Sequence, residues 1–105
     1  MASTFELKTD SQWIMVKTTF HPKKIVYSFK NKLGALLVEG KDKFFNAVPF
    51  EKGVGAVAIK NNHKTVNVVW YIVNENGDVL ETTKNIKIMR DAVNFYRNRN
   101  AEKQL

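Results

Sequence analysis

Most of the chain alternates between apolar and polar residues, which is the pattern of β-strands with one buried face. The clearest case is residues 24–30, where Ile25, Tyr27 and Phe29 form an apolar face opposite a polar one. Similar alternation predicts further strands at 4–8, 12–20, 35–39, 54–60, 65–74 and 79–83. We therefore expect six to seven short strands, joined mostly by hairpins, in an antiparallel β-sheet.

Turn residues separate these segments. Asn76-Gly77 predicts a tight hairpin because both residues tolerate a positive φ. Pro22 ends the strand before it, since proline cannot donate a hydrogen bond to a neighbouring strand. For the same reason Pro49 makes residues 43–50 either an edge strand or a loop.

The two longest strands differ in their faces. In 65–74 both faces are apolar, which predicts a strand that is covered on both sides. In 12–20 we assign Ile14 and Val16 to the interior, which leaves Trp13 on the opposite face.

The C-terminal segment changes period and predicts an amphipathic helix. Its apolar stripe is marked by Ile88, Met89, Ala92, Val93 and Tyr96. Phe95 widens this stripe, Arg97 is assigned to the outer face, and Asn85 is the expected N-cap. The whole pattern predicts an α+β fold, with an antiparallel sheet and one C-terminal amphipathic helix, in a single domain spanning residues 1–105.

Composition limits the compartment and the chemistry. The 105 residues are 44% hydrophobic, which is enough to bury a core without cross-links. There is no cysteine, so disulfides and thiolate metal sites are excluded. The N-terminus lacks a secretory signal, and the longest apolar run, 68–73, is too short to span a bilayer. We expect a cytoplasmic protein that does not enter a membrane.

The charge favours an anionic partner. Seventeen Lys and Arg against ten Asp and Glu give a net charge of +7 and a pI near 9.7. No acidic residue occurs between Asp10 and Glu39 or between Glu51 and Glu75. Acid-free strand regions predict a positive face, which suits the phosphates of nucleic acid.

A sheet that binds nucleic acid needs cations for phosphates and exposed aromatic rings for bases. Trp13 and Tyr71 lie opposite the faces assigned to the core, so they are the candidates for stacking on bases. The alternative is that a second layer over those faces buries them. Most other aromatic residues, Phe5 and Phe95 among them, are assigned to the interior. The residues expected at the interface are Trp13, Lys17, Lys23, Lys24, Lys30, Lys32, Lys60, Tyr71, Arg97 and Arg99.

The order of elements in residues 68–96 resembles that of the Whirly-like single-stranded DNA binders. The shared features are an apolar-aromatic strand, the Asn76-Gly77 hairpin, Ile86 and Ile88, and the closing helix. The resemblance is one of shape, and no site residue is carried over from it. It implies single-stranded or non-sequence-specific binding, by a homodimer whose copies pair through the helix or an edge strand.

A protein-interaction module or inhibitor is the alternative, for example a phage-encoded modifier of host machinery. Such a protein would act by adding an edge strand to a partner's sheet. Phe44, Phe45 and Phe50 would be its apolar anchors if exposed, and would cap one end of the core if buried. Exposed phenylalanines favour a protein partner, whereas buried ones beside a lysine-lined sheet favour nucleic acid.

Candidate catalytic residues are scarce. The two histidines, His21 and His63, lie in predicted turns without the spacing of metal ligands. No carboxylate pair or phosphate-binding glycine loop is present, so we expect no enzymatic activity, no metal and no cofactor. One enzymatic interpretation stays open, a small metal-independent ribonuclease that uses His63, Lys64, Tyr96 and Arg97.

Overall fold

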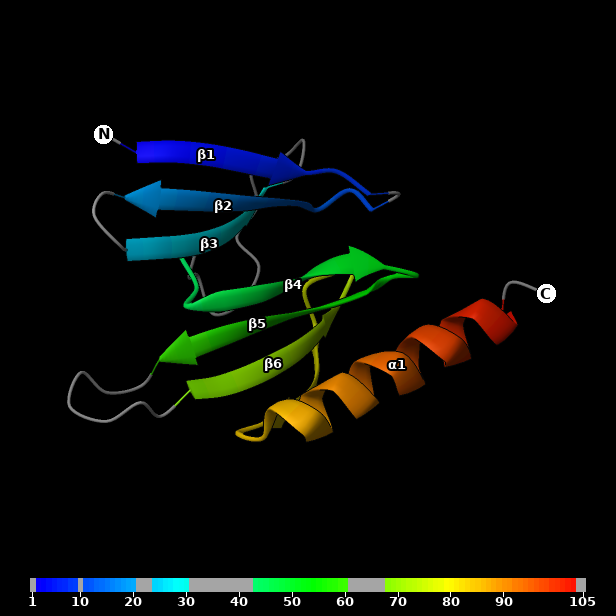
Figure 1. Ribbon diagram of the computed structural model, residues 1–105. Helices are drawn as coiled ribbons and strands as arrows, with labels where there is room; N and C mark the ends of the chain where they lie inside the picture. Colours follow the sequence, from blue (N-terminus) through cyan, green and yellow to red (C-terminus); the bar gives the residue numbers. More distant parts are fainter. Residues whose placement is uncertain (1, 10, 21–23, 31–42, 61–67, 104–105) are drawn as a thin grey trace.

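The computed structural model describes residues 2–9, 11–20, 24–30, 43–60 and 68–103. This part of the chain holds seven strands in two antiparallel sheets and one helix (Figure 1). Sheet 1 has the order β1 (Ala2–Leu7), β2 (Ile14–Phe20), β3 (Lys24–Lys30). Sheet 2 has the order β4 (Asn46–Glu51), β5 (Val54–Lys60), β6 (Val68–Asn74), β7 (Val79–Thr83), and α1 (Ile86–Lys103) follows. The predicted α+β fold is confirmed.

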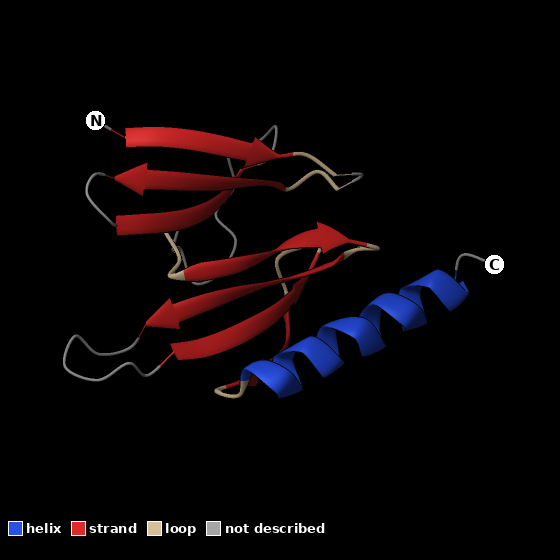
Figure 2. Ribbon diagram, in the orientation of Figure 1, coloured by secondary structure: helices blue, strands red, loops and turns tan. Residues whose placement is uncertain are grey.

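The molecule has three layers, because sheet 2 lies between sheet 1 and α1 (Figure 2). Successive residues of β5 and β6 point to opposite faces. Val57 and Val73 enter the core between the sheets, whereas Ala56 and Ile72 enter the core beneath the helix. The predicted covering of β6 on both sides is therefore confirmed. We call the two clusters the sheet–sheet core and the sheet–helix core.

Phe50 is fully buried in the sheet–sheet core. The Trp13 ring stacks on it at a centroid distance of 6.2 Å, and Phe29 meets it edge-on at 5.2 Å. Gly55 packs directly against the same ring, since a Cβ atom added there would lie 2.9 Å from the nearest Phe50 carbon. The glycine is required by this close approach.

The assignment of Ile14 and Val16 to the interior is wrong, and the alternative for Trp13 is confirmed, because a second layer buries it. Its side chain is 3% exposed and faces inward with Met15, whereas Ile14 is half-buried on the outer face of sheet 1. Alternation separates two faces but does not say which one meets another layer. Here the inward face takes the largest side chain, and its indole N–H is satisfied because it donates to the Glu75 carbonyl at 2.7 Å.

The helix begins as predicted. Its buried stripe is narrower than predicted. The Asn85 Oδ1 atom accepts hydrogen bonds from the backbone N–H groups of Lys87 and Ile88, at 2.8 and 3.1 Å, which is N-capping. Met89, Ala92 and Val93 are buried against sheet 2. Ile88 and Phe95 are exposed instead, because α1 rests on a single layer that covers only one arc of its surface.

The strands predicted at 24–30, 54–60 and 79–83 coincide with β3, β5 and β7. The ambiguous segment 43–50 yields the edge strand β4. The strand predicted at 35–39 lies outside the described residues.

Candidate nucleic-acid interface

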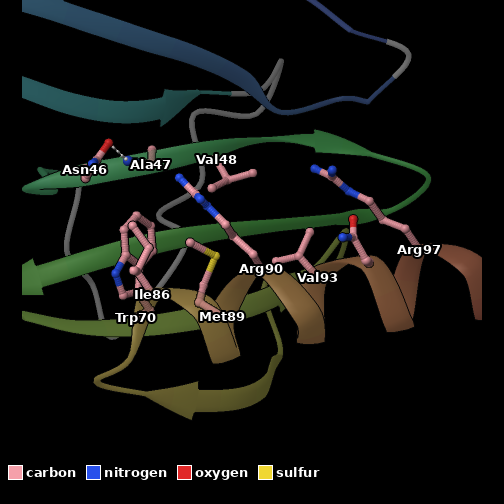
Figure 3. Close-up of a pocket in the computed structure, with 10 residues that line it drawn as sticks. Asn46, Ala47, Val48, Trp70, Ile86, Met89, Arg90, Val93 and Arg97 are labelled. Carbon is pink, nitrogen blue, oxygen red and sulfur yellow. Dashed lines mark hydrogen bonds between the residues drawn. The ribbon is translucent and has the colours of Figure 1, made fainter.

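A groove of about 440 Å³ runs between α1 and the edge strand β4 (Figure 3). Its floor is apolar and includes Val48, Trp70 and Val93. Its polar lining consists of two amides and two guanidinium groups, from Asn46, Asn94, Arg90 and Arg97. Residues 90, 94 and 97 recur at helical spacing, so they lie on one flank of α1. This flank faces β4 across the groove.

The Arg97 side chain binds groups of β4 and β5. Its Nη2 atom donates to the Pro49 carbonyl at 2.7 Å and to the Val54 carbonyl at 3.3 Å, and its Nη1 atom lies 3.6 Å from a Glu51 carboxylate oxygen. Burial lowers the pKa of the guanidinium below its ordinary value, and the Glu51 charge offsets part of this effect. The prediction that Arg97 lies on the outer face is wrong, because two backbone carbonyls draw its side chain inward.

Arg90 has the opposite surroundings. Its side chain is exposed, and within the described residues it has no hydrogen-bond or ion-pair partner. It is absent from the residues predicted at the interface. The signal that could have found it is its position seven residues before Arg97, which places both on one helix flank.

Lys60 and Phe45 extend the polar surface beyond the groove. Ala58 faces the sheet–helix core, so Lys60, two residues further along β5, falls on the same face. The Lys60 Nζ atom lies 5.7 Å from the centroid of the Phe45 ring, which is 48% exposed. Phe45 precedes Asn46 of the groove, so an exposed ring beneath a cation adjoins the site.

The outer edge of β4, together with Phe44 just before it, is closed to strand addition at three points. The Ala47 N–H is accepted by the Asn46 side chain at 2.8 Å. Pro49 has no N–H, and its carbonyl accepts from Arg97. Phe44 exchanges two backbone hydrogen bonds with Tyr27, at 2.7 and 3.0 Å. Blocked groups of this kind protect an edge strand from pairing with another chain.

The three phenylalanines proposed as anchors divide unequally. Phe44 and Phe50 are buried in the sheet–sheet core, and Phe45 is exposed. Two of the three therefore cap the core, which removes the main apolar contact that the edge-strand alternative requires.

The lysines of sheet 1 do not form the single basic face that was expected. Lys17 pairs in register with Tyr27, and Phe20 pairs with Lys24. By alternation the side chains of Lys17 and Lys24 lie on opposite faces of sheet 1. Lys17 lines a separate cleft between the sheets, with Phe5.

The remaining predicted residues are dispersed. Tyr71 is half-buried against the sheet–sheet core, and Arg99 is exposed on the part of α1 that does not line the groove. The side chain of Lys30 lies outside the described part, as do the residues Lys23, Lys32, His21, His63 and Lys64.

Two further findings concern the described part of the chain. Within it, no group of three or more His, Cys, Asp or Glu side chains gathers as a metal ion would need. No helix there is long and apolar enough to cross a membrane.

No family model, curated protein or solved structure matches this chain.

Proposed function

We propose that this protein binds single-stranded nucleic acid without sequence specificity, and that it does so at the groove between α1 and β4. The observation that carries the proposal is Arg90, an exposed cation on the groove without a partner in the described residues. Phe45, whose ring lies beneath Lys60, directly precedes the groove residue Asn46. Arg90 and Lys60 neutralise phosphates, and Phe45 stacks on a base.

The groove suits a single strand better than a duplex. Its apolar floor and the two amides of Asn46 and Asn94 offer contacts to unpaired bases. Stacking on Phe45 also requires a base whose face is free. Sequence-tolerant binding follows, because cations, one ring and an apolar floor read no particular base.

The proposal gives the protein a binding role and no reaction. The described residues that line the groove include no carboxylate and no histidine. The ribonuclease alternative loses support, because Arg97 is held by backbone carbonyls and Tyr96 packs against the sheet–helix core. The absence of cysteine favours a reducing compartment such as the cytoplasm.

Charge reversal tests the groove against the outer face of sheet 1. Arg90→Glu and Lys24→Glu each change the net charge by the same amount, on exposed residues. We expect Arg90→Glu to weaken binding about tenfold, equivalent to ~1.4 kcal/mol, and Lys24→Glu to have little effect. The measurement is fluorescence anisotropy with labelled single-stranded DNA, single-stranded RNA and duplex DNA.

Salt dependence adds an independent readout. The slope of log K against log salt should be shallower in Arg90→Glu, by about 0.7 for each phosphate of a single strand that is no longer neutralised. A larger effect of Lys24→Glu than of Arg90→Glu would move the site to sheet 1. Equal weak binding of all three nucleic acids that disappears at near-physiological salt would reduce the interaction to general attraction by a basic protein.

A protein partner is the second candidate, and one observation favours it. Several large apolar side chains are exposed away from β4, with Ile88 and Phe95 on α1 among them. Exposed apolar residues that gather on one surface mark contact sites between proteins.

A further inference from the structure

The surface of α1 that faces away from sheet 2 carries a stripe of five exposed residues. They are Ile88, Asp91, Phe95, Arg99 and Glu102, and we call them the outer stripe. Their spacings of three, four, four and three residues keep them on one face of a helix. The stripe is distinct from the helix flank that lines the groove with Arg90 and Arg97.

Phe95 forms the apolar centre of the outer stripe. Its side chain is 61% exposed, the largest exposure among the exposed large hydrophobic residues described. The ring contacts Tyr96 edge-on, at a centroid distance of 5.2 Å. An exposed phenylalanine is a suitable contact for another apolar surface.

Within the outer stripe, two opposite charges flank Phe95 at equal spacing. Asp91 precedes it by four residues and Arg99 follows it by four, so each lies about 6 Å from it along the helix axis. Neither side chain has an ion-pair partner within the described residues. A negative group and a positive group therefore flank the ring at equal distances, both unsatisfied within the described part of the chain.

This symmetry matches a second copy of the same helix running in the opposite direction. A two-fold axis beside Phe95 brings the two rings together and sets Asp91 of each copy level with Arg99 of the other. Two complementary ion pairs then enclose an aromatic contact, as an isologous interface requires. A partner with one sign of charge would match only one of the two groups that flank Phe95.

We propose that the protein self-associates as a two-fold dimer through the outer stripe, with the two α1 helices antiparallel. The interface leaves both α1–β4 grooves uncovered, because they lie on another flank of the helix. The proposal does not depend on nucleic-acid binding, and its tests use no nucleic acid.

Charge exchange between the two positions gives the sharpest test. In the Asp91→Arg dimer, the new arginine of each copy would lie against Arg99 of the other copy. In the Arg99→Asp dimer, the new aspartate of each copy would lie against Asp91 of the other. We expect each variant alone to associate at least about tenfold more weakly than the wild type. An equimolar mixture restores both ion pairs and recovers the dimer. Sedimentation equilibrium over a concentration series measures all three states.

The aromatic contact is tested with a matched pair of phenylalanines. Phe95→Ala should weaken association, whereas Phe5→Ala, which truncates a ring that is 60% exposed on sheet 1, should leave it unchanged. Circular dichroism establishes that each variant is folded. A wild-type protein that stays monomeric throughout the series overturns the proposal, and so does a mixture no more dimeric than its two components.

Discussion

At the scale of single residues, two arginines seven positions apart on α1 have different roles. Arg97 donates hydrogen bonds to the carbonyls of Pro49 and Val54, so its side chain connects α1 to β4 and β5. Arg90 has no hydrogen-bond or ion-pair partner in the described part, so its guanidinium group is available to a ligand. The sequence could place both on one helix flank, but it could not locate carbonyls that lie 43 and 48 residues away in the chain.

Replacement of each arginine by methionine separates these roles. Arg97→Met removes charge-assisted hydrogen bonds and should lower the free energy of unfolding by about 2 kcal/mol. Arg90→Met should change it by less than about 0.5 kcal/mol, because the side chain that it replaces is exposed and has no partner in the described part. Urea denaturation followed by circular dichroism measures both values. Equal effects of the two substitutions would mean that the hydrogen bonds of Arg97 do not stabilise the fold.

At the scale of elements, the local pattern predicts the positions of strands better than the direction of their faces. Turn or breaker residues close in sequence bound residues 24–30 and 54–60, so the local pattern predicts where these strands begin and end. The inward face of β2 depends on sheet 2, which comes later in the chain, and Trp13 was assigned to the wrong side for this reason. The width of the helix stripe was overestimated for the same reason, since nothing local reveals that one layer alone covers α1.

Burial of the helix can be tested at Val93, whose side chain is 3% exposed in the sheet–helix core. Val93→Asp puts an unpaired carboxylate there and should cost about 3 kcal/mol or more of stability. The neighbouring substitution Asn94→Asp adds the same charge on an exposed position and should be nearly neutral. Thermal melting compares the two. A Val93→Asp protein that melts with the wild type would contradict the packing of α1 on sheet 2.

At the scale of the whole molecule, sheet 2 belongs to both cores at once. Val57 and Val73 face sheet 1, while Ala56 and Ile72 on the same two strands face α1. Neither core can open without disturbing β5 and β6. The two cores are therefore expected to unfold together, as a cooperative unit does.

The two tryptophans of the chain report on this cooperation, because Trp13 lies in the sheet–sheet core and Trp70 in the sheet–helix core. Trp70→Phe leaves a fluorophore in the first core, and Trp13→Phe leaves one in the second. In each variant the denaturation curve seen by fluorescence should coincide with the curve seen by circular dichroism. Curves that separate in either variant would show that one core opens before the other.

The hydrogen bond from the Trp13 indole to Glu75 spans 62 residues, and it has a consequence for synthesis on the ribosome. At about 5–20 residues per second, the partner of Trp13 is made about 3–12 s after Trp13 itself. Early in this interval β1, β2 and β3 can pair, but the apolar face that holds Trp13 and Phe29 has no second layer until β4 and β5 have been made. We expect the nascent chain to be most prone to aggregation in this interval, and most dependent on a chaperone that shields three uncovered strands.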